Sequence, residues 1–247
     1  MFRSAASPRR CRYGRGRITS RPTPGWRLTR FPWTCGSADP VTLNPWGDRR
    51  LRRIGLLGGS FNPAHAGHLH VARRVRRALR LDEVWLMVSP GNPLKPARGM
   101  APFRERLASA WRIADGRRIR ATGIEAAFGT RFSVDTLRQL RRRFPRARFV
   151  FVIGADNLWQ LPRWQGWRDI VAHTPIAVLP RPGWTRRALA GQAAHLLARH
   201  RRRPGALLAG PARGPAPPAC GHAPWCFVPA AEHAASATAI RAAMQAG

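Results

Sequence analysis

The stretch IGLLGGSFNPAHAGHLH, residues 54 to 70, decides the fold and points to a site. Its short apolar run predicts a buried strand that ends at Leu57, because such runs, bounded by turn-forming residues, are typical of buried strands. Gly58, Gly59, Ser60 and Phe61 then lie at the carboxyl end of this strand. An arginine-rich helical pattern follows, so the stretch predicts a strand that passes through a glycine turn into a helix.

That helix is predicted over 68–81. Leu69, Ala72, Val75 and Leu79 share one face at helical spacing, and five arginines occupy the other faces. The pattern indicates an amphipathic helix that packs its apolar face on the sheet.

The rest of the chain alternates between strand and helix patterns. Strands that alternate with helices imply right-handed crossovers, so we expect an α/β fold with a doubly wound, mostly parallel sheet. Such sheets bind ligands beyond the carboxyl ends of their strands. The segment 184–223 shows no clear pattern. Further strands are predicted at 83–88, 118–122, 147–154, 175–179 and 225–229, and further helices at 101–115, at 133–144 with Ser133 as N-cap, and from Ser236 onward.

Residues 1–50 differ in composition from the remainder. They repeat Arg, Pro, Gly and Ser and contain no acidic residue before Asp39. We therefore expect a disordered, basic leader over 1–50 and one folded domain over 51–247. The leader lacks the apolar stretch of a secretory signal, and its prolines oppose an amphipathic transit helix.

The net charge of +33 comes almost entirely from arginine, because Lys95 is the only lysine. So basic a chain is attracted to polyanions such as nucleic acid, acidic membrane surfaces or nucleotides. A genome-wide bias toward arginine codons is the simpler explanation of this composition. We expect non-specific nucleic-acid binding at low salt that fades as salt rises.

The four cysteines do not make a disulfide scaffold in a chain of 247 residues. Cys220 and Cys226 flank His222, but the spacing fits no standard zinc pattern, so we name no protein ligand for a metal. No apolar run approaches the roughly 20 residues of a membrane span. We expect a cytoplasmic protein without membrane contact; the sequence leaves a homo-oligomer open.

His65 and His68 stand three residues apart at the predicted junction between strand and helix. Both rings can face the helix N-terminus, where unpaired amides and the helix dipole favour negative charge. Gly58 and Gly59 let the backbone approach a bulky anion. One histidine beside a helix is usually incidental, but the whole string predicts a phosphate site.

The string GGSFNPAHAGH resembles the signature of the nucleotidyltransferase superfamily that carries an H-x-G-H motif. Within the superfamily, the chain is most similar to bacterial nicotinate-nucleotide adenylyltransferases. The resemblance covers about 51–247 and implies a Rossmann-like nucleotidyltransferase fold. The further matching segments are NPLKP (92–96), GTRFSVDTL (129–137), FVIGADNLWQLPRW (151–164) and SATAIR (236–241).

The resemblance implies adenylyl transfer from ATP to nicotinate mononucleotide, which gives deamido-NAD and pyrophosphate in NAD biosynthesis. The attacking atom is already a phosphate oxygen, so the protein must hold two polyanions in line and stabilise the charge that develops. Mg²⁺ is expected as the partner of ATP, held chiefly by phosphates and water.

The resemblance also assigns roles to residues. His65, His68 and Arg241 are the predicted catalytic residues: the imidazoles contact the ATP phosphates and the guanidinium clamps the triphosphate. Trp164 stacks on the pyridine ring, and the loop with Thr130, Arg131 and Ser133 receives the nicotinate carboxylate at a helix N-terminus. The predicted ATP- and phosphate-binding residues are Gly58, Gly59, Ser60, Phe61, Lys95, Gly154, Asp156, Ser236 and Thr238.

Two alternatives stay open at this point. A sister adenylyltransferase would use phosphopantetheine or nicotinamide mononucleotide as the acceptor and share the terminal motifs. A more distant alternative is a basic nucleic-acid-binding protein, indicated by the leader and by the arginine runs of 73–80 and 141–148.

Overall fold

The computed structural model describes residue 43 and residues 47–91, 99–209 and 221–230. They belong to one compact unit, which runs from Ala38 to Gly247. Leu43, within the predicted leader, is buried in the hydrophobic core of this unit. The rest of the leader up to residue 42, and the helix predicted from Ser236, lie outside the described residues.

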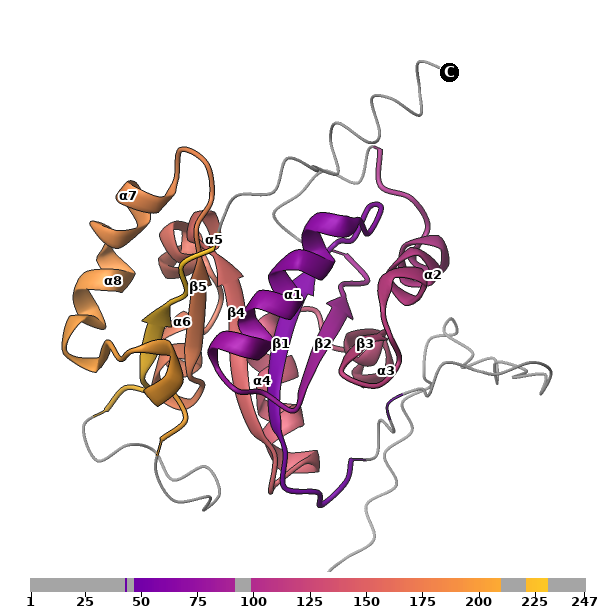
Figure 1. Cartoon of the computed structure of the whole chain (residues 1–247), viewed down its shortest axis with the longest axis horizontal. Helices are drawn as coiled ribbons and strands as arrows, with labels where there is room; N and C mark the ends of the chain where they lie inside the picture. The colour runs from indigo at the N-terminus through magenta and orange to yellow at the C-terminus, as the bar shows by residue number, and fades with distance from the viewer. Residues whose placement is uncertain (1–42, 44–46, 92–98, 210–220, 231–247) are drawn as a thin grey trace, which may run out of the picture. The chain divides into compact units, whose positions relative to one another are not determined.

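The structure contains a six-stranded parallel sheet in the order β3-β2-β1-β4-β5-β6 (Figure 1). This confirms the predicted doubly wound α/β fold. The first strand continues through both glycines, because Gly58 and Gly59 pair with Met87 and Val88, so the prediction that it ends at Leu57 is wrong. The strands are β1 Arg53–Gly59, β2 Glu83–Val88, β3 Ile119–Thr122, β4 Arg148–Gly154, β5 Ile176–Leu179 and β6 Trp225–Phe227.

Alternate strand residues enter two separate cores, one on each face of the sheet. Leu56 and Phe151 pack in one core, whereas their neighbours Leu57 and Val152 pack in the other. Successive side chains of a strand point to opposite faces, and both faces are covered here. This is why the strands appear in the sequence as continuous apolar runs.

Helices α1 (Ala66–Ala78) and α2 (Phe103–Ile113) cover one face, and α4 (Ser133–Arg143) packs on the other, so α1 lies in front of the sheet and α4 behind it in Figure 1. Ala72 and Val75 of α1 are buried, as its apolar stripe predicts.

Several short helices were not predicted, because five to seven residues are too few to show an apolar stripe. The N-cap of α4 is Phe132, so the prediction of Ser133 as N-cap is wrong; Ser133 is the first helical residue. The segment 184–223, unassigned from sequence, contains α7 and α8. The short helices are α3 Ile124–Phe128, α5 Ala155–Gln160, α6 Trp167–His173, α7 Thr185–Leu189 and α8 Gln192–Leu196.

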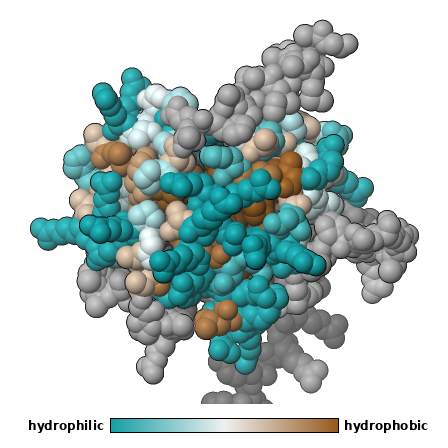
Figure 2. All heavy atoms as spheres, in the orientation of Figure 1, coloured by the Kyte–Doolittle hydropathy of each residue, from teal (hydrophilic) through white to brown (hydrophobic). Residues whose placement is uncertain are grey.

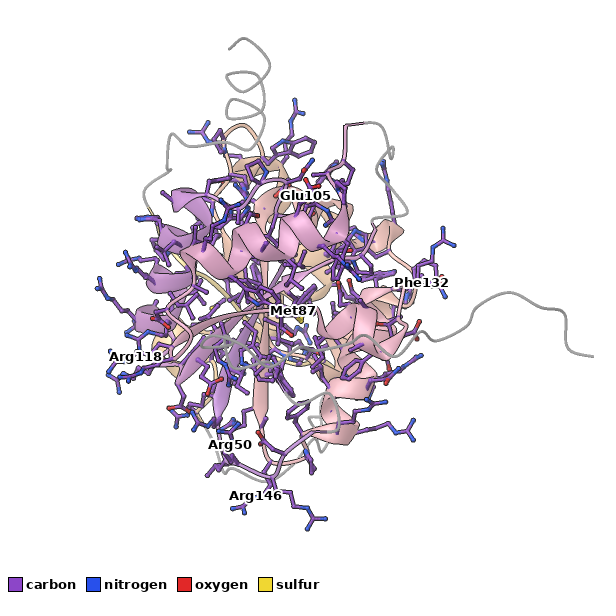
Figure 3. All side chains as sticks on the ribbon, turned by 90° about the vertical axis from the view of Figure 1, so that its right-hand side faces the viewer. Arg50, Met87, Glu105, Arg118, Phe132 and Arg146 are labelled. Atoms are coloured by element: carbon purple, nitrogen blue, oxygen red, sulfur yellow. The ribbon has the colours of Figure 1, made fainter. Side chains whose placement is uncertain are left out.

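Arginines of the described residues lie mainly on the surface. The face that carries α1 is largely hydrophilic (Figure 2). In Figure 3, Arg50, Arg118 and Arg146 point outward, whereas Met87 lies in the interior. Within the described part of the chain, no helix has the length and apolar character needed to cross a bilayer.

Candidate active site

The predicted phosphate site lies where the strand order of the sheet reverses. The chain passes from β1 to β2 and β3 on one side, and then returns to place β4 on the other side of β1. Ligands of doubly wound sheets bind at such a switch point, beyond the carboxyl ends of the strands. Gly59 and Gly154 end these two neighbouring strands, at the upper edge of the sheet in Figure 1.

His65 and His68 form the N-terminal cap of α1. His65 is the N-cap residue, and its Nδ1 accepts a hydrogen bond from the Gly67 N–H at 3.1 Å. The Nδ1 of His68 accepts from the His65 N–H at 3.2 Å. The two ring centroids are 3.9 Å apart. The structure thus brings the two imidazoles together at the helix N-terminus.

These cap bonds determine which ring nitrogen carries the proton. A neutral imidazole has one acceptor nitrogen and one donor nitrogen. Because Nδ1 is the acceptor in both rings, the proton of each neutral ring lies on Nε2. Burial, assisted by the charges of His65 and Arg181, lowers the pKa of His68 to about 3. His68 is therefore neutral near pH 7 and presents an uncharged N–H donor.

Arg181 is a cation at this edge that the sequence analysis missed. It follows β5, its Nε lies 3.7 Å from Asp156 Oδ1, and its side chain is 53% exposed. Its charge also acts on the His68 imidazole. Arginine is too frequent in this chain for one more to stand out in the sequence. Only the order of the strands, with β5 beside β4, identifies it.

Gly154 leaves room for the Asp156 and Arg181 side chains. A Cβ atom on Gly154 would overlap the Asp156 carboxylate and would lie 2.9 Å from Arg181 Nε. Asp156 belongs to the first turn of α5, and among the described residues its buried Oδ1 has no hydrogen-bond donor. Buried carboxylate oxygens normally accept a hydrogen bond. This oxygen is therefore an acceptor that a ligand hydroxyl can satisfy.

Thr130 belongs to a hydrogen-bonded cluster between α3 and α4. Its Oγ1 lies 2.7 Å from Thr136 Oγ1, and its N–H donates to the Glu125 carbonyl at 3.1 Å. The Thr136 hydroxyl donates to Glu125 Oε1 at 3.4 Å. Burial raises the pKa of Glu125 to about 7. Sequence analysis missed both Glu125 and Thr136, because their effect on the loop depends on contacts between two helices.

The turn that carries Trp164 lies beside the start of α4. Gly166 has a φ of +63°, and a Cβ atom there would lie 3.0 Å from the Val134 methyl groups. Trp164 is partly buried, its ring centroid is 6.2 Å from that of Phe151, and its Nε1 has no hydrogen-bond partner among the described residues. The two segments predicted to bind the nicotinate moiety are thus neighbours.

The remaining described residues of the predicted site fall near these groups. Phe61 is buried, with its ring centroid 4.8 Å from that of His68, and Ser60 precedes it after β1. Arg131 is exposed, with its guanidinium 5.8 Å from the Phe132 ring centroid. Lys95, Ser236, Thr238 and Arg241 lie outside the described residues.

The acidic, histidine and cysteine side chains give no metal centre in the described ranges. No group of three or more of them is placed to hold an ion there. His200 and His222 do approach each other, with ring centroids 5.4 Å apart, but no third such ligand joins them among the described residues.

Known proteins resemble this chain over most of its length. A family model described as cytidylyltransferase-like matches residues 56–243. A protein of Gluconobacter oxydans named "Probable nicotinate-nucleotide adenylyltransferase" is 60% identical over 191 residues, which make up 76% of this chain and 93% of that protein. The chain belongs to the nicotinate-nucleotide adenylyltransferase family. A second member of this family, from Gluconacetobacter diazotrophicus, is 56% identical and covers 81% of this chain and 90% of its own length.

Solved structures show the same fold. Plasmodium falciparum nicotinic acid mononucleotide adenylyltransferase complexed with APC matches with a TM-score of 0.54 at 13% identity, over 77% of this chain and 83% of that chain. The same enzyme complexed with NaAD matches with a TM-score of 0.53. At this identity the likeness concerns the fold alone, and it confirms the Rossmann-like nucleotidyltransferase fold.

Proposed function

We propose that this protein transfers the adenylyl group of ATP to nicotinate mononucleotide and forms deamido-NAD and pyrophosphate in NAD biosynthesis. One observation carries the proposal. In a member of the nicotinate-nucleotide adenylyltransferase family, two paired imidazoles lie at the start of α1, the charge of Arg181 acts on His68, and Arg181 forms an ion pair with Asp156. This arrangement suits the phosphates and the ribose of a nucleotide.

The reaction is a direct in-line displacement. A phosphate oxygen of nicotinate mononucleotide forms a bond to the α-phosphorus of ATP while the bond from that phosphorus to the bridging oxygen breaks. Pyrophosphate leaves with the electron pair of the broken bond, and no proton has to move. The protein contributes orientation, which can supply roughly 7–11 kcal/mol, and donors aimed at the developing charge.

His65 and His68 donate from Nε2 to the ATP phosphates, with His68 directed at the α-phosphate. A neutral donor at His68 fits this task because it stabilises charge without titrating near pH 7. Arg181 supplies the cation beside them. Asp156 Oδ1, which accepts no hydrogen bond among the described residues, accepts a ribose hydroxyl. Backbone groups line the ATP-binding half of the proposed site, and they belong to Gly58, Gly59, Ser60, Phe61 and Gly154.

Residues outside the described ranges bind the triphosphate tail in this proposal. Ser236 and Thr238 cradle the β- and γ-phosphates, Arg241 clamps them, and Lys95 adds a point charge. Motif resemblance supports these four roles. On the acceptor side, Trp164 stacks on the pyridine ring, and Thr130, Arg131 and Ser133 receive its carboxylate at the start of α4.

A divalent metal accompanies ATP in this proposal, and Mg²⁺ is the ion that fits best. The donors at the site are imidazoles and a guanidinium, with Asp156 as the one carboxylate described at the edge, so the phosphates and water would supply most of its ligands. When bound, Mg²⁺ neutralises charge on the phosphates; Asp156 is the described side chain chemically suited to approach it.

Purified protein assayed with ATP and Mg²⁺ tests the proposal. Nicotinate mononucleotide should turn over with release of pyrophosphate, and nicotinamide mononucleotide should turn over more slowly, because it lacks the carboxylate that Thr130, Arg131 and Ser133 receive. Phosphopantetheine should not react. Turnover with phosphopantetheine alone would assign the chain to the sister activity.

We further propose that residues 1–50 carry no chemistry and that the protein acts in the cytoplasm. Deletion of residues 2–37, which leaves the unit beginning at Ala38 complete, should leave kcat/KM unchanged. The exposed arginines should also bind nucleic acid without sequence preference at low salt, and this binding should weaken steeply as salt rises. A salt-resistant preference for one sequence would contradict it.

A further inference from the structure

Arg106 is a buried arginine of α2 that the proposed chemistry does not use. It is 3% exposed. Its Nη1 donates to the carbonyl oxygens of Ser60 at 2.8 Å and Ser89 at 2.7 Å, its Nη2 to Pro90 at 3.1 Å, and its Nε to Ala101 at 2.9 Å. One guanidinium thus holds four main-chain carbonyls.

These carbonyls belong to three segments of the proposed active-site edge. Ser60 begins the loop that follows β1, Ser89 and Pro90 follow β2, and Ala101 leads into α2. The partners of the Arg106 guanidinium among the described residues are all carbonyl groups, and none is a carboxylate. Such a pattern serves to fix backbone, because a planar fork of donors sets the relative positions of its acceptors.

Neighbouring bonds hold the same loop from the same side. The Ser109 hydroxyl, one turn along α2, accepts from the Ala64 N–H at 3.0 Å. The Asn62 side chain donates to the Gly99 carbonyl at 2.9 Å and accepts from the Ala101 N–H at 3.1 Å. The loop from Ser60 to Ala64 is therefore fastened to α2 and to the segment before it.

This fastening determines where the loop's amide groups point. The N–H that follows a trans carbonyl points the opposite way across the peptide plane. Because the Ser60 carbonyl faces Arg106, the N–H of Phe61 faces away from Arg106. Phe61 has a φ of +48°, a left-handed conformation that a bulky residue adopts only where its surroundings enforce it. Arg106 and Ser109 are the polar groups that hold the backbone on either side of it.

We propose that Arg106 is a positioning residue for ATP: it sets the loop from Ser60 to Ala64 and the β2–α2 connection so that the Phe61 amide and the histidines capping α1 face the phosphates. This inference rests on the proposed adenylyl transfer. Burial lowers the pKa of Arg106, but a guanidinium stays charged in proteins, so its positive charge also favours the polyanion above it.

The decisive comparison is Arg106→Met, which fills the space without donors, against Arg112→Met, an exposed arginine on the same helix. Both are measured beside wild type with ATP varied at saturating nicotinate mononucleotide, and with the mononucleotide varied at saturating ATP. We expect Arg106→Met to lower kcat/KM for ATP about 100-fold, as a displacement near 1 Å would. The KM for the mononucleotide and all constants of Arg112→Met should stay as in wild type.

Two further variants keep the test decisive if Arg106→Met does not fold. Arg106→Lys retains the charge with fewer and less rigid donors, and Ser109→Ala removes only the neighbouring fastening. Both variants should fold with a near-native melting temperature. Each should lose less kcat/KM for ATP than Arg106→Met and keep the wild-type KM for the mononucleotide. Affinity lost equally for ATP and the mononucleotide would overturn the positioning role. A folded Arg106→Lys variant with the wild-type kcat/KM for ATP would overturn it as well.

Wild-type behaviour separates this inference from the proposed function. If wild type does not turn over ATP with nicotinate mononucleotide, the proposed function fails, and binding of a non-hydrolysable ATP analogue by calorimetry then tests Arg106 alone. Weaker analogue binding by Arg106→Lys than by Arg112→Met would support the positioning role, and equal binding would refute it. If wild type is active and Arg106→Met is equally active, only the positioning role fails.

Discussion

The start of α1 and the loop before α4 carry the two halves of the proposed site, and they are built differently. At α1 the functional side chains make the local bonds themselves, because His65 and His68 cap the helix that presents them. Before α4, Thr130 is held from behind by Glu125 and Thr136, which belong to two helices. The phosphate half is thus ordered by neighbours in sequence, and the acceptor half by packing between elements.

The two halves also differ in the pKa values of their titratable side chains. The His68 imidazole is held neutral far below physiological pH, with a pKa of about 3, whereas the buried Glu125 carboxyl has a pKa of about 7. Changes of pH in the physiological range should therefore alter the protonation of Glu125 in the acceptor half and leave His68 in the phosphate half neutral. Each prediction below tests one side of this difference.

The largest effect is expected at His68. An asparagine places its oxygen near the position of Nδ1 and retains the cap bond, whereas a glutamine places its amide nitrogen near Nε2 and retains the donor. We expect His68→Asn to lower kcat/KM about 10²–10³-fold, the range found when one transition-state donor is lost. His68→Gln should retain more activity than His68→Asn. Steady-state kinetics decide, and the reverse order would show that capping matters more than donation.

The second-largest effect on activity is expected at Arg181. Arg181→Met should lower kcat/KM about 10- to 100-fold, because a hydrogen bond to a charged group contributes about 1.5–3 kcal/mol. It should also raise the pKa of His68, since a positive charge facing the ring is removed. Imidazole NMR titration measures that shift. Arg187→Met on the exposed side of α7 is the control, and it should change neither quantity.

Trp164 tests the acceptor half through stacking. Trp164→Ala should raise the KM for nicotinate mononucleotide about tenfold and leave the KM for ATP unchanged, because aromatic stacking contributes about 0.5–1.5 kcal/mol beyond buried area. Trp164→Phe should recover most of the affinity. If both substrates lose affinity equally, Trp164 supports the core through its contact with Phe151 instead.

Glu125 gives the smallest effect on activity and a defined effect on stability. Its pKa is raised from 4.5 to about 7, so the folded state binds the proton more tightly than the unfolded chain. This contribution is present at low pH and is lost as pH rises from about 4.5 through about 7, by about 3 kcal/mol at most. Glu125→Gln stays neutral and should remove that dependence. Urea unfolding at about pH 5 and about pH 8 measures it, with the exposed Glu105→Gln as control.

The predictable features were those with a strong local signal. The strands from Arg53 and from Arg148 appear as apolar runs because both faces of the sheet are covered. α1 has a clear apolar stripe over 13 residues. Five-residue helices such as α3 and α7 lack the length for such a stripe, and Ser133 failed as an N-cap because its hydroxyl caps no amide of α4.

The residues of the proposed site also separate into those with a local sequence signal and those without one. His65, His68 and Gly154 could be predicted because each lies at a junction between a strand and a helix, which the local sequence pattern reveals. Arg106, Glu125 and Arg181 could not, since each acts on groups from another part of the chain. Arg106 acts on carbonyls up to 46 residues away, and Arg181 acts on an imidazole from which the four strands β2 to β5 separate it along the chain.

The sequence by itself determined that an apolar strand leads into an amphipathic helix, that their junction carries paired imidazoles, and that the chain forms alternating strands and helices. These are short-range properties, set by apolar periodicity and by hydrogen bonds over three or four residues. Only the tertiary structure decided which cation faces His68, which carboxyl supports Thr130, and what holds the loop from Ser60 to Ala64. Those choices depend on strand order and on burial, and both arise from contacts between residues that are distant in the chain.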